Sequence, residues 1–123
     1  MSNDTKRLKE ICNKIIELNP KIRFAGVISP YGKTIAGKIK PGVKPLFKSE
    51  EAMNEFFLTA VREMLRKPFE DSLGKHILTL TMHEKVNSIA ISSNKHILYI
   101  TFEKDATFDE MLDVANKARE LLS

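Results

Sequence analysis

The chain has 123 residues, of which 42% are hydrophobic and 29% are charged, a composition that indicates a globular protein and excludes a disordered or fibrous one. Its 20 basic and 16 acidic residues give a formal net charge of +4, and its single cysteine, Cys12, excludes an internal disulfide and a cysteine-cluster metal site. Because no apolar run approaches the roughly 20 residues of a membrane span and the polar first ten residues lack the apolar stretch of a signal peptide, we expect one cytoplasmic domain over residues 1–123.

The first predicted element is an amphipathic helix over residues 4–18, where apolar side chains recur at helical spacing. It should end at Asn19, because the following proline disfavours helical geometry in that residue. From residue 22 to residue 29 the period of the apolar side chains changes to two, which predicts a strand. One face of this strand should carry Ile22, Phe24, Gly26 and Ile28, and the other Arg23, Ala25, Val27 and Ser29.

A β-hairpin is predicted around the turn at residues 29–32. Pro30 fixes φ at the second position of that turn, and Gly32 is free to adopt a positive φ. Residues 34–40 then alternate again and form the second strand. The surrounding segment, residues 18–49, holds seven basic residues and no acid, whereas the remaining 13 basic and 16 acidic residues give the rest of the chain −3.

A long middle helix follows an irregular loop. The loop, residues 41–48, contains two prolines and a glycine. Ser49 is the predicted N-cap of the helix, and the two glutamates after it suit the positive end of the helix dipole. Pro68 should end this helix near Lys67, and Gly74 should cap the short segment beyond it.

Three short strands are predicted between His76 and Glu103, and their β-branched residues and short connections indicate an antiparallel meander. The final helix should begin with a capping box in which Thr107 and Glu110 bind each other's backbone N–H groups. The order is therefore α-β-β-α-β-β-β-α. Because both faces of the sheet are apolar, we expect an α+β fold with a five-stranded antiparallel sheet, the terminal helices on one face and the middle helix on the other.

This order of elements, the hairpin strand 24–28 with its Tyr31-Gly32 turn, and the capped final helix resemble the Roadblock/LC7 family of profilin-like domains. Small archaeal proteins also have this look, and an archaeal branch is one alternative for the chain. The resemblance implies a non-catalytic homodimeric module that binds or regulates small GTPases or acts as a scaffold beside them. It also implies a dimer interface on the middle helix and the next strand. The matching residues are Met53, Phe56, Phe57, Ala60, Val61 and Met64, followed by Ile77, Leu78, Thr79, Leu80, Thr81 and Met82.

The segment 77–82 also argues for a dimer by itself. It contains no proline and no charge, and it carries four large apolar side chains at a predicted edge of the sheet. A bare edge of this kind invites uncontrolled pairing with other chains. We therefore expect a second copy to cover it, although a loop or the middle helix of the same chain is an alternative.

The candidate chemical groups do not indicate catalysis, and no cofactor or metal is expected. His76 and His96 should share one end of the meander and His83 the other, so they are interpreted as surface histidines, since two of them without a third ligand do not make a zinc site. Cys12 lies in the apolar stripe of the first helix and should be a buried hydrophobe. The Gly32-Lys33-Thr34 sequence lacks the earlier glycine and the following helix of a phosphate-binding loop.

Two further partner classes remain open. A weak binder of an anionic polymer such as nucleic acid would use the basic hairpin and loop, but few exposed aromatics accompany the charges. A profilin-like ligand sensor would need a well-formed apolar pocket beneath the middle helix. The third alternative is that the basic residues bind no partner and only keep the hairpin and the loop soluble. The candidate anion-binding residues are Lys33, Lys38, Lys40, Lys44 and Lys48.

Overall fold

The computed structural model describes residues 2–123 and has the predicted order of elements. These elements are α1 (Ser2–Ile16), β1 (Ile22–Ile28), β2 (Thr34–Ile39), α2 (Ser49–Arg66), η1 (Lys67–Phe69), α3 (Glu70–Leu73), β3 (Leu78–Met82), β4 (Val86–Ser92), β5 (Ile97–Glu103) and α4 (Phe108–Leu122). The short η1 and α3 turns only prolong the end of α2. The α+β fold class is therefore confirmed.

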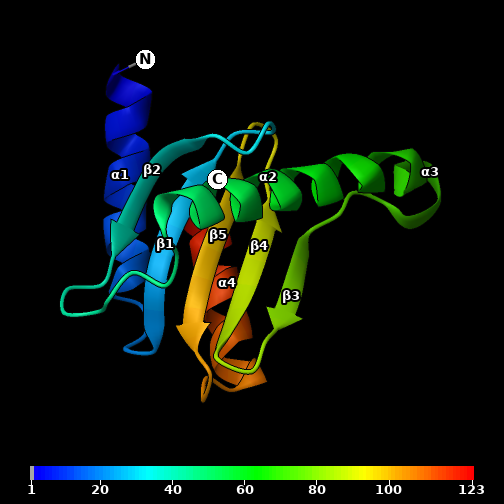
Figure 1. Cartoon of the computed structure of the whole chain (residues 1–123). Helices are drawn as coiled ribbons and strands as arrows, with labels where there is room; N and C mark the ends of the chain where they lie inside the picture. The colour runs from blue at the N-terminus through cyan, green and yellow to red at the C-terminus, as the bar shows by residue number, and fades with distance from the viewer. Residues whose placement is uncertain (1) are drawn as a thin grey trace.

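The five strands form one antiparallel sheet in the order β2-β1-β5-β4-β3 (Figure 1). The central pairing of β1 with β5 brings together the hairpin and the meander, which are far apart in the sequence. The two edges of the sheet are β2 and β3. The prediction that residues 77–82 provide a sheet edge is thus confirmed.

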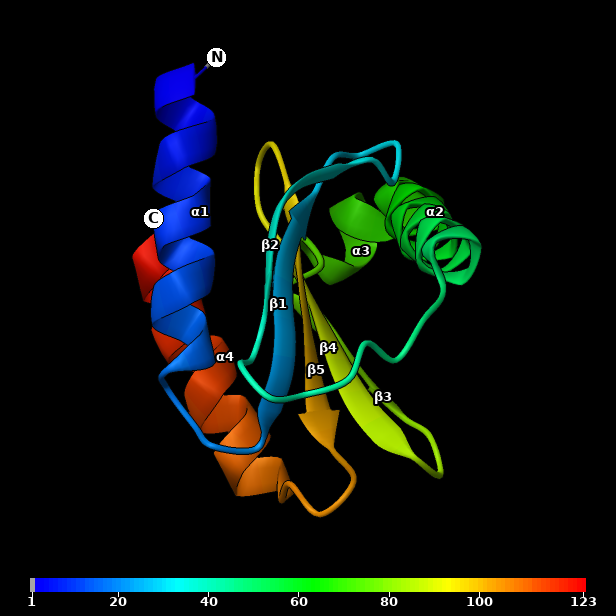
Figure 2. The ribbon, with the colours of Figure 1, turned by 60° about the vertical axis from the view of Figure 1, so that its left-hand side comes forward.

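Helices cover both faces of the sheet, as expected. Figure 2 shows α1 and α4 side by side on one face and α2 on the other, with both ends of the chain on the α1 and α4 side. The larger apolar cluster lies between the sheet and α1 and α4, and includes Leu8, Ile15, Phe102, Met111 and Val114. A smaller cluster lies beneath α2. The interior is therefore divided by the sheet into two unequal layers.

The predicted alternation of β1 is wrong at its first two residues, since Arg23 lies on the α2 side with Phe24. Ile22 packs in the larger cluster together with Ala25 and Val27, whereas Phe24 packs on the α2 side. The cause is a register shift between Ile22 and Phe24 in the pairing with β5. Such a β-bulge inserts an extra residue and reverses the face of the residues before it.

The helix ends follow the predicted signals with two exceptions, of which the first is α1, predicted over residues 4–18 but observed over Ser2–Ile16. Helix α2 ends at Arg66, directly before the turn that contains Pro68, and Gly74 has a φ of 81°. At its start, however, the N-cap is Lys48 and not Ser49. The backbone N–H of Lys48 donates to Glu51 Oε1 at 3.2 Å, so a glutamate in the first turn accepts the hydrogen bond of the cap residue.

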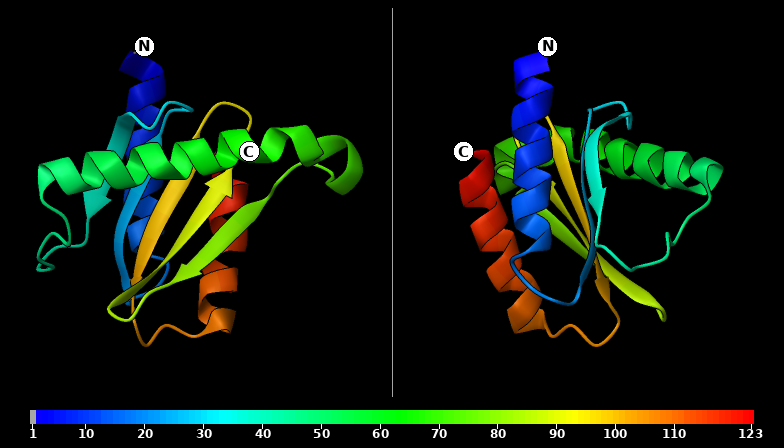
Figure 3. Two further views of the ribbon diagram at one scale, coloured as in Figure 1. Left: turned by 45° about the vertical axis from the view of Figure 1, so that its right-hand side comes forward. Right: turned by 90° about the vertical axis from the view of Figure 1, so that its left-hand side faces the viewer.

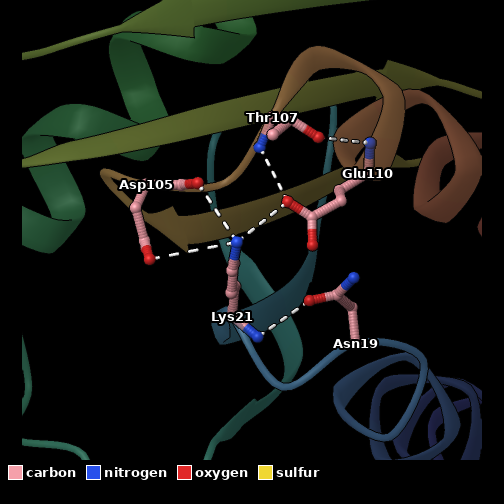
Figure 4. A network of polar contacts seen from close by, with 5 residues as sticks. All are labelled: Asn19, Lys21, Asp105, Thr107 and Glu110. Carbon is pink, nitrogen blue, oxygen red and sulfur yellow. Dashed lines mark hydrogen bonds and ion pairs between the residues drawn. The ribbon is translucent and has the colours of Figure 1, made fainter.

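The capping box of α4 is confirmed and forms part of a larger polar network (Figure 4). Thr107 N donates to Glu110 Oε1 at 2.9 Å, and Glu110 N donates to Thr107 Oγ1 at 3.1 Å. Lys21 Nζ lies 3.0 Å from the same Glu110 oxygen and also donates to the backbone oxygen of Asp105. The Thr107 N–H bond first, and then Lys21, lowers the pKa of Glu110 to about 2. This network joins the α1–β1 connection to the start of α4.

Candidate interaction surface

Helix α2 presents one side to the sheet and the other to solvent. Phe56, Thr59 and Ala60 are buried, and Phe56 contacts the rings of Phe24 and Tyr99. Two of the predicted interface residues, Phe56 and Ala60, therefore face the core of their own subunit, because they lie on the side of α2 that packs against the sheet. Val61 is half-buried. The exposed apolar residues of α2 are Met53, Phe57, Leu58, Met64 and Leu65.

The middle of α2 packs on an apolar cluster, whereas its end contacts the sheet through polar side chains. Phe56 and Ala60 pack on Ile28, Ile97 and Tyr99. The Tyr99 hydroxyl donates to Glu55 Oε2 at 2.7 Å, and burial first, then this carboxylate, raises the pKa of Tyr99. Towards the end of the helix the contacts with the sheet are made by hydrogen-bonding side chains.

His76 is the centre of the polar contacts near the end of α2. Its Nδ1 atom lies 2.7 Å from both Glu63 Oε1 and Ser92 Oγ, and its Nε2 atom lies 2.7 Å from Thr79 Oγ1. The Ser92 hydroxyl also donates to Glu63. The His76 side chain is only 14% exposed. Its interpretation as a surface histidine is therefore wrong, and no local pattern indicated its burial, because Glu63 and Ser92 are distant in the sequence.

The three histidines form no metal site. His83 is exposed in the β3–β4 turn, and His96 is half-buried at the other end of β4, the end at which His76 lies. Among residues 2–123, no three histidine, cysteine, aspartate or glutamate side chains gather in a way that could hold a metal ion. Cys12 is buried in α1, and burial raises the pKa of its thiol to about 11. This thiol is protonated at neutral pH and is a poor nucleophile.

Strand β3 presents an open backbone edge. Ser92 N donates to Ile77 O at 2.9 Å, and His83 N donates to Val86 O at 3.0 Å. The residues on either side of β3, Ile77 and His83, are therefore both hydrogen-bonded to the β4 side. The register between them is unbroken. Because bonded and non-bonded pairs alternate in an antiparallel ladder, the backbone N–H and C=O groups of Leu78, Leu80 and Met82 point away from β4, towards the open edge.

The side chains of β3 are divided between the two faces of the sheet. Leu78 and Leu80 pack against the larger cluster. Thr79 and Thr81 lie on the α2 side, near Glu55 and Thr59. Ile77 and Met82, at the two ends of the segment, are exposed. Residues 77–82 can therefore contact a partner mainly through their outward backbone N–H and C=O groups, and through the exposed side chains of Ile77 and Met82.

The end of α2 and its continuation overhang this edge. Figures 1 and 3 show that α2 crosses the sheet and that η1 and α3 extend beyond β3. Leu65, Phe69 and Leu73 are exposed on the overhang, and Leu73 reaches 73% exposure. The sequence analysis missed Phe69 and Leu73 as interface candidates, because the predicted helix ends before Pro68, and it missed Leu65 because the resemblance extends the interface only to Met64. Their apolar character was the available signal.

The five candidate anion-binding lysines do not form one surface. Lys38 is paired with Ala25 on the α1 and α4 side of the sheet, whereas Lys44 lines a cavity on the α2 side. Lys40 Nζ donates to the backbone oxygens of Asn19 and Pro20. Lys33 lies in the β1–β2 turn and Lys48 at the start of α2. Nothing in this arrangement supports nucleic-acid binding.

An apolar cavity of about 250 Å³ lies beneath the start of α2. Its walls come from β1, β2, Thr101 of β5, the loop 41–48 and the first turns of α2. The predicted ligand-sensor alternative required an apolar pocket beneath the middle helix, and this cavity occupies that position. In residues 2–123, no helix combines the length and apolarity needed to cross a membrane.

Comparison with solved structures finds the same fold in bacterial proteins. The gliding protein MglB of Thermus thermophilus gives a TM-score of 0.77 at 17% identity, over 95% of this chain and 86% of that one. MglB in a tetrameric arrangement gives 0.78 at 15% identity, over 95% and 85%. A Roadblock/LC7 domain from Streptomyces avermitilis gives 0.66 at 12% identity, over 94% and 97%.

These likenesses confirm the predicted resemblance at the level of the fold. The chain has the Roadblock/LC7, profilin-like fold, with a similar topology over nearly the whole length of each neighbour. No family model matches the sequence, and no curated protein does. Sequence identities of 12 to 17% show the fold and leave the function to be argued from the surface.

Proposed function

Starting from the Roadblock/LC7 fold, we propose that this protein is a non-catalytic interaction module that acts as a homodimer and binds or regulates a small GTPase. The proposal takes residues 1–123 as a single cytoplasmic domain. It needs a surface for a second copy and a separate surface for the partner. The open edge of β3 and the outer side of α2 supply these two surfaces.

The observation that carries the proposal is the uncovered backbone of β3. Leu78, Leu80 and Met82 direct unpaired N–H and C=O groups outwards, and an antiparallel copy of the same strand would satisfy them about a twofold axis. The exposed side chains of Phe69 and Leu73 overhang the edge and would cover the neighbouring subunit. MglB, which has the same fold, occurs in a tetrameric arrangement.

The partner surface is the outer side of the first half of α2. Met53 and Phe57, which the resemblance placed in the dimer interface, are exposed there together with Leu58, away from β3, and we assign all three to the partner instead. Exposed apolar and aromatic residues that are grouped on one element mark a protein contact more often than an ordinary solvated surface. The family resemblance makes a small GTPase the expected partner, and the chain itself has no phosphate-binding loop.

The dimer is tested by placing a proline at each edge of the sheet. Met82→Pro removes an outward-pointing N–H from β3 but no hydrogen bond of the β3–β4 ladder. A twofold dimer would lose one hydrogen bond from each copy. At about 1 kcal/mol per hydrogen bond, the dissociation constant of the dimer should rise roughly thirty-fold. Sedimentation equilibrium measures this change.

The matched control is Ile39→Pro on the opposite edge. Lys40 N donates to Arg23 O at 2.9 Å, so the alternation directs the N–H of Ile39 away from β1. Ile39→Pro should leave the dimer intact. A wild-type protein that sediments as a monomer at micromolar concentration, or equal weakening by both prolines, would remove the basis of the proposal. Circular dichroism establishes that both variants are folded.

A further inference from the structure

The apolar cavity beneath the start of α2 is not used by the dimer or by the GTPase surface. It has a volume of about 250 Å³ and lies on the β1–β2 side of the sheet, far along the strand order from β3. Its lining is almost entirely apolar and includes Phe24, Ile39, Val43, Leu46, Phe47 and Phe56. A cavity of roughly 150 Å³ with apolar walls is large enough to bind benzene.

The floor of the cavity is built by an aromatic ring over two glycines. Gly26 and Gly37 are paired across β1 and β2, and the ring of Phe24 lies over both. A Cβ atom at Gly26 would come within 2.6 Å of Phe24 Cζ, and one at Gly37 within 3.1 Å of Cε1. The ring is also stacked on Phe56, with a centroid distance of 6.1 Å. A side chain at Gly26 would therefore displace the ring from this position, and one at Gly37 would crowd it.

The roof of the cavity, the loop 41–48, is fastened to the sheet by Arg23. The guanidinium Nη2 donates to the backbone oxygen of Lys44 at 3.1 Å, and Nη1 pairs with Glu103 Oε1 at 3.0 Å. Glu103 thus balances the charge of Arg23, and Arg23 holds the loop in place over the cavity. The loop contributes Val43, Leu46 and Phe47 to the lining, so the cavity depends on this attachment.

The lining of the cavity includes two basic residues, Arg23 and Lys44, and Arg23 is paired with Glu103. Lys44 is exposed, and among residues 2–123 no carboxylate forms an ion pair with its Nζ atom. The whole segment 18–49 that forms the hairpin and the loop contains no acid. A neutral hydrocarbon would leave this charge without a counterpart, whereas an amphiphile with an anionic head would fill the cavity and pair with Lys44.

We propose that this cavity binds a medium-chain fatty acid anion, with its tail on Phe24 and Phe56 and its carboxylate at Lys44. By proportion to benzene, the volume suits a chain of about ten carbon atoms. The inference develops the ligand-sensing alternative and is independent of the dimer. Failure of the β3 proline test would leave it unaffected, because no lining residue belongs to β3.

The test is a titration of the full chain with decanoate below its micelle concentration, followed by ¹H–¹³C spectra of the methyl groups and by calorimetry. Shifts should be confined to the methyl groups that line the cavity, those of Thr34, Ile39, Val43, Leu46, Ala52 and Thr101. Ala52→Phe, which places a ring in the cavity from α2, should weaken binding at least ten-fold. Lys44→Glu should weaken it roughly five-fold, the equivalent of a surface ion pair.

The matched control is Lys33→Glu, which makes the same charge change on the hairpin outside the cavity and should leave the affinity unchanged. Decanol should bind more weakly than decanoate. No binding at millimolar decanoate, methyl shifts elsewhere, or equal effects of Lys33→Glu and Lys44→Glu would overturn the proposal. Binding to vesicles of anionic phospholipid without binding of free decanoate would also overturn it. Because the wild-type spectra locate the ligand, the test does not depend on the folding of Ala52→Phe.

Discussion

Gly32 lies where the β1–β2 turn passes close to α2. Its φ is 86°, and a Cβ atom added there would come within 2.6 Å of the Cα atom of Phe57. Gly42 has nearly the same φ, 84°, but open space around it. A substitution at Gly42 would therefore introduce backbone strain alone, whereas one at Gly32 would introduce the same strain and a steric clash with α2.

We expect Gly42→Ala to lower the free energy of unfolding by about 1–2 kcal/mol, the strain of a left-handed residue with a side chain. Gly32→Ala should lower it further, by at least about 1 kcal/mol beyond Gly42→Ala, because the turn must also move away from the backbone of α2. Urea denaturation of both variants measures the difference. Equal losses would mean that the contact with Phe57 relaxes freely.

Glu110 gives the protein a dependence on acid pH. The Thr107 N–H bond and Lys21 hold the pKa of Glu110 at about 2, below the ordinary value of 4.5. A carboxyl whose pKa is lowered by folding stabilises the fold fully above its unfolded pKa and ceases to do so as the pH falls towards the folded value. This contribution should therefore disappear as the pH falls from 4.5 to about 2.

Glu110→Gln tests this dependence. The variant should be less stable than the wild type at neutral pH, and the difference should shrink as the pH falls through the window from 4.5 to about 2. Urea denaturation at several pH values measures it. Glu120→Gln, an exposed position near the end of the same helix, is the control. A difference between wild type and Glu110→Gln that stays constant with pH would contradict the assignment.

At the scale of elements, the second half of α2 is held to the sheet by His76. Removing the imidazole would leave the Glu63 carboxylate, which is 17% exposed, with Ser92 as its remaining partner. We expect His76→Ala to lower the free energy of unfolding by about 1–3 kcal/mol and to speed amide exchange in residues 64–73 more than elsewhere. Hydrogen exchange with mass spectrometry measures the local effect.

The control is His83→Ala, at an exposed position in the β3–β4 turn. It should change neither the stability nor the exchange of α2. A double-mutant cycle between His76→Ala and Glu63→Gln should show a favourable coupling free energy between the two side chains, because they are in direct contact. Additive effects of the two substitutions would contradict the role assigned to His76.

Local patterns predicted the elements well, and long-range contacts explain where they failed. Apolar spacing, Pro68, Gly74 and the Thr107 capping box each act within a few residues, and the structure agrees with all of them. The β-bulge after Ile22 depends on the pairing with β5, which is distant in the sequence. No pattern within a single strand could have revealed it.

The candidate surface was predicted in outline only. The edge position of residues 77–82 followed from the order of the strands, and it is confirmed. Which side of α2 faces the sheet depends on the crossing of helix and strands, so Phe56 and Ala60 were placed in the interface although they are buried. The cavity was likewise not predicted, because its floor is the Phe24 ring, which lies over Gly26 and Gly37 on two paired strands.

At the scale of the whole molecule, the exposed first half of α2 should decide partner binding. Phe57 is 60% exposed on α2, and Phe108 is 57% exposed at the start of α4. If α2 is the partner surface, Phe57→Ser should abolish capture of a small GTPase while leaving the dimer intact, and the matched Phe108→Ser should not. Mass spectrometry of material captured in the presence of a GTP analogue or GDP identifies the partner.

Two results would speak against this partner surface. One is capture of the same proteins by wild type and Phe57→Ser. The other is captured material that contains no small GTPase with either nucleotide. Sedimentation of Phe57→Ser alongside the wild type shows whether the dimer has been kept, so that loss of the partner is not confused with loss of self-association.

The position of α1 and α4 has a practical consequence. Both ends of the chain emerge on the face opposite α2 (Figure 2). A fluorescent fusion or a tether to a sensor chip, joined at either end, would therefore leave α2 exposed to the solution. Immobilised protein should then present its partner surface in one orientation, and on-chip kinetics would report on that surface rather than on the attachment.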